Sequence, residues 1–268
     1  MEVMRIAPVL LAGLVFAVSL AAQQPKKRLL FIGESKGWQH ESISDAAATL
    51  WKLGHLSGLW ETVIRTDCQL ITKKKLDLHA TNLDTFDAVA FFTTGELDMD
   101  DSQKADLLSF VHDDGKGFIA IHSATDTFYK WPAYGDMVGG YFDEHPWMTF
   151  EAPLIVEDPK FPGMRHLKKA FTMRDEIYQI KDFSREKVRV LLRLDESKLD
   201  LKNPKVHRTD GDFAVMWART YGKGRVLYDG LGHVEAVWDR PDIQKMYVEQ
   251  VKWIMGLEPG DAMPRPRP

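Results

Sequence analysis

Three histidines of this chain, His40, His122 and His233, lie at or after the ends of apolar runs that are typical of strands. A fourth, His145, lies on the long loop that follows His122. Imidazole titrates near neutral pH and is a common ligand of divalent metals, so histidines that meet in one place can move protons or hold a metal ion. The chain has no local metal motif such as His-Glu-x-x-His, which leaves both kinds of chemistry open.

Two hypotheses follow for the chemistry of His122. In the first, His122 is a general acid or base that works with a second group on a hydroxylated substrate, and the candidates for that group are His40, His145 and Glu176. In the second, some of the four histidines bind a divalent metal such as zinc, with Glu176 or Asp126 as a further ligand. Such a metal would polarise a substrate oxygen or activate water.

Aromatic rings and acids crowd the segment between His122 and Trp147, and this composition predicts a carbohydrate ligand. Rings can cover the C–H face of a pyranose while carboxylates accept hydrogen bonds from its hydroxyls. In a strand, Glu176 and Tyr178 share a face, so a carboxylate and a phenol would point together into the same crevice. The predicted substrate-binding residues are Ser123, Asp126, Tyr129, Trp131, Tyr141, Trp147, Tyr178 and His233.

An α/β fold with a parallel sheet would bring these residues together. Strands are predicted over 28–33, 60–66, 86–93 and 117–121, with helices over 42–54 and 100–115. The apolar side of the first helix would consist of Ala47, Leu50, Trp51 and Leu53. Ligands of an open parallel sheet bind beyond the carboxyl ends of its strands, because the loops there face one crevice. That rule places His40, His122 and His233 at one edge, where His145 can join them.

After Trp147 the pattern changes to strands with few helices between them. Strands are predicted over 149–156, 176–180, 188–194 and 213–220, followed by a tight turn at 221–224 and a strand over 225–231. We expect these strands to extend the sheet in a mixed or antiparallel way. A helix over 242–255 closes a single domain, 28–257, and the Pro-rich tail 258–268 is expected to be frayed.

The composition is that of a globular protein and argues against a nucleic-acid partner. The 268 residues are 44% hydrophobic and 28% charged, with a net charge of -4 and one short basic run at 73–75. Cys68 is the only cysteine, so no intrachain disulfide can form.

The first residues of the chain have the pattern of a targeting segment. Arg5 precedes an apolar run from Ile6 to Leu20, and small residues follow it, which predicts a signal peptide over 1–22 and a secreted or periplasmic protein. A retained N-terminal anchor is the alternative. After signal cleavage, no membrane span is predicted.

Several motifs occur in order between Leu29 and Gly256. They are His40-Glu-Ser, Gly117-Phe-Ile-Ala-Ile-His-Ser-Ala-Thr-Asp-Thr-Phe, Trp131-Pro-Ala-Tyr, Gly139-Gly-Tyr-Phe, His145-Pro-Trp, Asp175-Glu-Ile-Tyr, Tyr221-Gly-Lys-Gly-Arg-Val and Leu231-Gly-His. In these motifs the chain resembles the ThuA-like family of trehalose-utilisation proteins, within the class I glutamine amidotransferase-like superfamily. The resemblance implies a flavodoxin-like three-layer sandwich with a mostly parallel central sheet and an antiparallel extension.

In the amidotransferase relatives, the turn after the corresponding strand presents a catalytic cysteine on a sharp elbow. This chain has His122 and Ser123 there, and Cys68 lies on another segment, so the resemblance does not carry a cysteine-dependent glutaminase mechanism to this chain. The sharp turn itself is expected to persist. Ser123 could be a nucleophile, but the sequence identifies no base for it.

The resemblance also links the chain to disaccharide catabolism in which a partner sugar dehydrogenase makes a 3-keto sugar. The chain has no dinucleotide-binding fingerprint, so we expect it to act on the disaccharide or its 3-keto derivative without performing the oxidation. The expected reactions are isomerisation, and elimination or hydrolysis of the glycosidic bond. A non-catalytic carbohydrate-binding module and a subunit of a larger sugar-active assembly are the alternatives, and a homo-oligomer is compatible with all of these.

Overall fold

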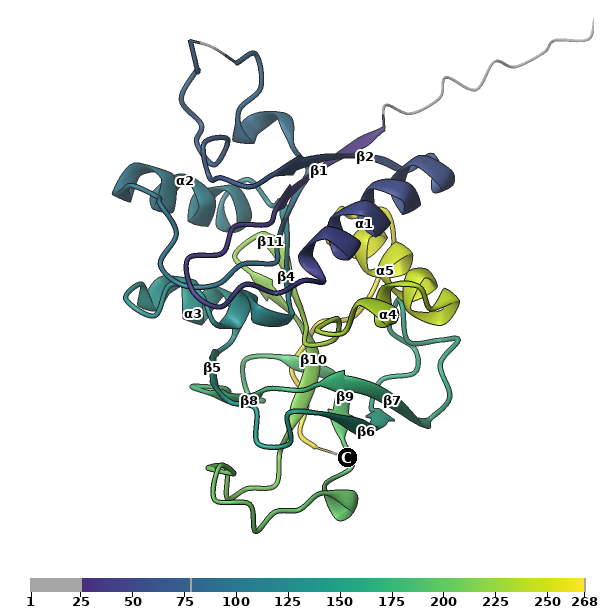
Figure 1. The fold of residues 1–268 in the computed structure, drawn as a ribbon. Helices are drawn as coiled ribbons and strands as arrows, with labels where there is room; N and C mark the ends of the chain where they lie inside the picture. Colours follow the sequence, from purple (N-terminus) through teal and green to yellow (C-terminus); the bar gives the residue numbers. More distant parts are fainter. Residues whose placement is uncertain (1–25, 78, 268) are drawn as a thin grey trace, which may run out of the picture.

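Five parallel strands form one half of the central sheet in this computed structural model, which describes residues 26–77 and 79–267 (Figure 1). They are β1 Lys27–Ile32, β2 Trp60–Arg65, β3 Ala88–Phe91, β4 Gly117–Ile121 and β11 Gly224–Asp229. Their order is β2-β1-β3-β4-β11, so β11 fills the fifth position of a flavodoxin-like sheet. The predicted fold class is therefore confirmed.

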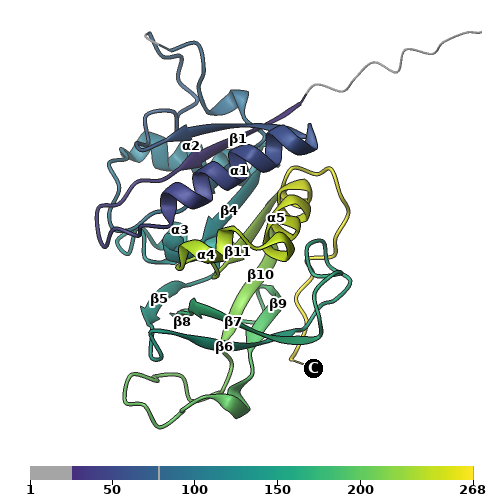
Figure 2. The ribbon, with the colours of Figure 1, turned by 45° about the vertical axis from the view of Figure 1, so that its right-hand side comes forward.

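Four antiparallel strands extend the same sheet beyond β11. They are β10 Ala214–Tyr221, β9 Arg189–Leu194, β6 Thr149–Val156 and β7 Ala170–Glu176, in that order across the sheet. β10 and β11 form the predicted hairpin, in which Gly222 takes a φ of 57°. Two short strands, β5 Tyr141–Glu144 and β8 Gln179–Lys181, pair separately. The antiparallel strands lie below the parallel half in Figure 2.

Helices cover both faces of the parallel half and complete a three-layer sandwich (Figure 2). α1 Ile43–Ser57, α4 Glu235–Trp238 and α5 Pro241–Ile254 pack on one face, and α2 Asp101–His112 and α3 Pro132–Val138 on the other. Successive side chains of a strand point to opposite faces. Accordingly, Leu29 and Phe31 of β1 join the core under α1 and α5, while Leu30 and Ile32 join the core under α2 and α3.

The ends and buried faces of the helices agree in part with those predicted from the sequence. α2 begins as predicted, with the Asp100 side chain accepting from the Gln103 backbone N–H and the Gln103 side chain accepting from the Asp100 N–H. In α1, Trp51 was expected to face the core but is 52% exposed. Its ring stacks on that of His55 on the outer face of the helix.

Two predicted segments have a different structure. The segment from 123 to 145, expected to be a loop, contains α3, which is too short for hydrophobic periodicity to reveal; Pro132 in its first turn is the local signal. The strand predicted over 176–180 is broken, because β7 ends at Glu176 and β8 begins at Gln179. Most of β7 was missed, since this edge strand exposes one face and has few apolar residues.

The Pro-rich tail packs against the domain, which corrects the expectation of a frayed end. Ala262 is buried, and Asp261 forms an ion pair with Arg189 at 2.6 Å. Arg265 donates to the Glu157 carbonyl, and Arg267 pairs with Glu196.

No helix in the described part of the chain combines the length and hydropathy needed to cross a membrane. The signal peptide predicted over 1–22 lies outside the described residues.

Candidate functional site

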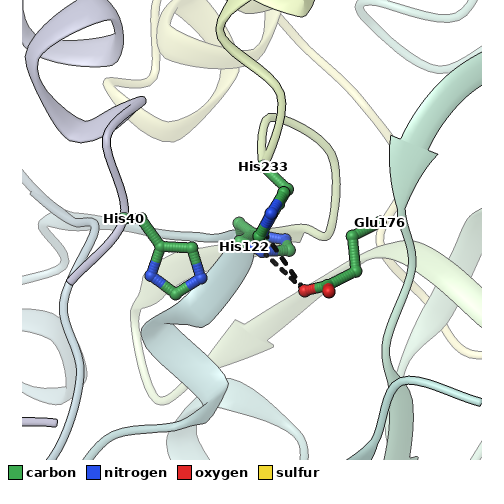
Figure 3. Close-up of side chains that lie close together, drawn as sticks. All are labelled: His40, His122, Glu176 and His233. Carbon is green, nitrogen blue, oxygen red and sulfur yellow. Dashed lines mark hydrogen bonds and ion pairs between the residues drawn. The ribbon is translucent and has the colours of Figure 1, made fainter. Parts of the chain in front are cut away.

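Three histidines and one glutamate from four separate segments meet beyond the carboxyl ends of the parallel strands (Figure 3). These residues, His40, His122, Glu176 and His233, are called the His/Glu cluster below. Each offers one ligand atom, and the four atoms lie within 4.8 Å of one another. The histidines follow β1, β4 and β11, and the glutamate ends β7. The structure thus brings together the three histidines that the sheet-edge rule had placed at one rim.

His122 occupies the sharp turn that directly follows β4. Its φ is 42°, which is uncommon for a residue with a side chain, so the expected turn is present with an imidazole at its apex. The fully buried ring lies 3.1 Å from the Gly230 carbonyl through Nδ1. A carbonyl only accepts, so Nδ1 carries the proton and donates it. The other nitrogen, Nε2, therefore presents a lone pair to the cluster.

His233 and Glu176 lie against that lone pair. His233 Nδ1 is 3.2 Å from His122 Nε2 and 3.2 Å from Glu176 Oε1, and His122 Nε2 is 3.7 Å from the same oxygen. Burial lowers the pKa of His233, but the hydrogen bond and charge of Glu176 outweigh it and leave that pKa above its ordinary value. In the absence of a bound cation, His233 can hold the proton that offsets the Glu176 charge.

His40 completes the cluster with one ring nitrogen facing the other three side chains (Figure 3). Its Nε2 lies 3.3 Å from the Tyr178 hydroxyl. Burial, with the charge of His233, lowers the pKa of His40 to about 4. Burial also lowers the pKa of His122 well below its usual value, with His40 and His233 adding to the effect. Both rings are therefore neutral near pH 7, and neutral imidazole is the form that binds metals.

The cluster has the composition of a divalent metal site. Nitrogen and carboxylate oxygen ligands suit zinc and related transition metals. Histidine ligands commonly donate their second ring N–H to a fixed acceptor, as His122 does to Gly230. The site also places three buried or half-buried imidazoles around one carboxylate, an arrangement that a bound cation would stabilise.

Asp175 connects the end of β7, which carries Glu176, to the turn that carries His233. It was not among the predicted site residues. Its buried carboxylate accepts the backbone N–H groups of Gly232 at 2.7 Å and of Val234 and Glu176 at 3.0 Å. These bonds attach the end of β7 to the turn that carries His233. In the sequence Asp175 is marked by its position beside Glu176. That position does not predict contacts with a turn 57 residues away.

His145 lies beside the cluster and is not one of its ligands. Its Nδ1 is 3.5 Å from Glu144 Oε1, and its ring centroid is 6.4 Å from that of Tyr178. Of the candidate ligands, His40, His122, His233 and Glu176 form the cluster, whereas His145 and Asp126 lie outside it. Tyr178, by contrast, lies in contact with His40 and His122. Glu176 and Tyr178 do approach the same site, although they do not share a strand.

Several rings predicted to contact a sugar are packing residues in the structure. Tyr141 is buried, and its hydroxyl lies 2.7 Å from the Trp131 carbonyl. Trp131 packs on Phe128 and Tyr134, and Trp147 packs on Phe213. Sequence composition cannot separate rings that fasten a segment from rings that hold a ligand, because the same residue types do both.

The remaining predicted residues differ in their access to solvent. Tyr129 is 39% exposed and donates its hydroxyl to Asp126 Oδ1 at 2.6 Å. Burial raises the pKa of Asp126, against the lowering effect of Tyr129. Ser123 is fully buried, and within residues 26–77 and 79–267 its Oγ has no hydrogen-bond partner. Tyr129 and Asp126 therefore remain accessible to a ligand, whereas Ser123 does not.

Comparisons with known proteins agree on the family. Among solved structures, a ThuA-like protein from Bacteroides uniformis has a TM-score of 0.71 at 20% identity, covering 87% of this chain and 93% of that one. A ThuA-like protein from Parabacteroides merdae has a TM-score of 0.65 at 16% identity, covering 87% and 90%. No curated protein sequence matches the chain. The ThuA family model, described as trehalose utilisation, matches residues 28–254, and the chain therefore belongs to the ThuA family.

Proposed function

We propose that this protein is an enzyme that acts on a carbohydrate, with a divalent metal such as zinc held by the His/Glu cluster. One observation carries the proposal: three imidazoles and one carboxylate, from four segments far apart in the sequence, place their ligand atoms within 4.8 Å of one another. Such convergence of titratable groups at the carboxyl edge of a parallel sheet is typical of an active site.

The chain's own residues are arranged to hold such an ion. Gly230 keeps His122 in the tautomer whose Nε2 is free, and burial keeps His40 and His122 neutral. Glu176 supplies the negative charge that a divalent cation requires. When bound, the metal would act as a Lewis acid that polarises a substrate oxygen.

The substrate class follows from the family and from the chemistry of the site. The family description is trehalose utilisation, which supports a disaccharide or its 3-keto derivative. A carbon next to a keto group is acidic, so a base that removes its proton would start isomerisation, or an elimination that breaks the glycosidic bond and is followed by addition of water to the new double bond. His145 is free for this role, because it lies beside Tyr178 and outside the ligand group. A partner sugar dehydrogenase would supply the keto sugar.

The protein's location is part of the same proposal. The N-terminal segment with the pattern of a signal peptide would direct the enzyme to the periplasm or the outside of the cell.

Metal binding and turnover test the proposal together. The purified protein is titrated with Zn²⁺ by calorimetry and incubated with trehalose and with a 3-keto disaccharide. We expect one zinc ion per chain and conversion of the sugar, and we expect His122→Ala to lose both. His55→Ala is the matched control, because His55 is exposed on α1, and it should retain both.

Two results would contradict the proposal. Wild-type protein that binds no metal, or His122→Ala that binds it as well as wild type does, would refute the metal centre. Sugar binding without turnover in the metal-loaded wild type would favour the non-catalytic carbohydrate-binding module instead.

A further inference from the structure

The hydroxyl of Tyr178 has a single hydrogen-bond partner in the described part of the chain. That partner is His40 Nε2, at 3.3 Å. The phenol ring is held in place, because it is 5% exposed and packs against the rings of His122 at 4.3 Å and Phe142 at 4.4 Å between centroids. The position of the hydroxyl beside the His/Glu cluster is therefore fixed by packing.

A metal ion bound to His40 Nε2 and the Tyr178 hydroxyl compete for the same ring nitrogen. A neutral imidazole has one nitrogen that carries hydrogen and one that accepts. If His40 binds a cation through Nε2, which is the nitrogen beside Tyr178, that lone pair can no longer accept the phenol hydrogen. The phenol then becomes a buried donor without a partner, which is unfavourable.

We propose that Tyr178 is a catalytic residue whose hydroxyl leaves His40 when that nitrogen binds a divalent metal and donates instead to the substrate oxygen on which negative charge develops. This inference rests on the proposed function. In the keto-sugar reaction, the base takes the proton from the carbon beside the carbonyl, and the bonding electron pair moves toward the carbonyl oxygen. The Tyr178 hydrogen bond stabilises that oxygen, while the phenol keeps its own proton.

For Tyr178→Phe we expect zinc affinity to rise and turnover to fall. The variant removes the hydroxyl and keeps the ring packed on His122. Zinc no longer has to displace a hydrogen bond, so its affinity should rise about 2–10-fold, which corresponds to a net hydrogen bond of about 0.5–1.5 kcal/mol. Turnover of a 3-keto disaccharide should fall about 100-fold in kcat/KM, as for other lost donors to a developing oxyanion.

Zinc calorimetry and steady-state kinetics are measured on wild type, Tyr178→Phe and Tyr221→Phe. Tyr221 is the control, because it ends β10 at the hairpin and lies outside the cluster, so both its readouts should match wild type. A purely structural role for the phenol would lower zinc affinity in Tyr178→Phe. Unchanged or weaker zinc binding by that variant, or unchanged kcat/KM, would overturn the inference.

The proposed function fails in a different way. If wild-type protein binds no zinc, both proposals are refuted. If wild type binds zinc and Tyr178→Phe behaves like wild type, only the role of Tyr178 is refuted.

Discussion

Replacing Asp175 by asparagine should weaken metal binding without removing any ligand. The Asp175 carboxylate accepts three backbone N–H groups, two from the turn that carries His233 and one from Glu176 itself. It therefore fixes the position of Glu176 relative to His233. Asparagine has nearly the same shape but only one acceptor oxygen, and its NH₂ group would face at least one backbone donor.

The size of the effect follows from these contacts. A hydrogen bond to a charged acceptor contributes about 1.5–3 kcal/mol, and Asp175→Asn loses at least one. Burial, however, raises the pKa of Asp175 to about 6 from 3.8, so removing its charge offsets that loss near pH 7, and the free energy of unfolding of the metal-free protein should change little. Groups that orient metal ligands typically change metal affinity by about 10–100-fold when they are replaced. We therefore expect Asp175→Asn to lose zinc affinity by this factor, with little change in the stability of the metal-free protein.

The assay compares zinc affinity by calorimetry with urea unfolding in the presence and absence of zinc. Asp158→Asn is the matched control, because Asp158 is also buried and hydrogen-bonded, to Arg189 at 2.7 Å in the antiparallel strands, and lies outside the cluster. Asp158→Asn should lose stability and keep zinc affinity, whereas Asp175→Asn should lose zinc affinity, so its stabilisation by a fixed zinc concentration should shrink. Equal zinc affinity in wild type and Asp175→Asn would refute this account of the residue.

Three further predictions concern other parts of the molecule. His145→Ala should keep wild-type zinc stoichiometry in calorimetry but lose about 100-fold or more in turnover, and loss of the metal would contradict the ligand set. Burial raises the pKa of Asp229 to about 7 from 3.8, so its carboxylate increasingly destabilises the fold as the pH rises from about 4 to about 7. The free energy of unfolding of Asp229→Asn relative to that of wild type should therefore rise by up to about 4 kcal/mol from pH 4 to pH 8 in urea unfolding, and a pH-independent difference would contradict this. Deleting residues 261–268 should lower the urea midpoint, because it removes the ion pair of Asp261 with Arg189; an unchanged midpoint would show that the tail contributes nothing to stability.

Much of the parallel half of the fold was predictable, because its signals are local. Continuous apolar runs mark β1, β3 and β4, and the acids before α2 mark its first turn. The positions of His40, His122 and His233 follow from the same strands, since each histidine comes shortly after a strand whose carboxyl end reaches a common edge. The sharp turn at His122 was also anticipated from the family resemblance.

The sequence offered both Glu176 and Asp126 as a further ligand, and only the tertiary structure decided between them. Glu176 ends β7, which is separated from β11 by three other strands in the sheet order, and no spacing in the sequence indicates that it would meet His122. It does so because the carboxyl ends of β7 and β11 are tied together through Asp175. His145 is closer to His122 in the chain, yet it stays outside the ligand group. Local patterns specify strands and turns, whereas the meeting of two strand ends depends on how the whole sheet is twisted and packed.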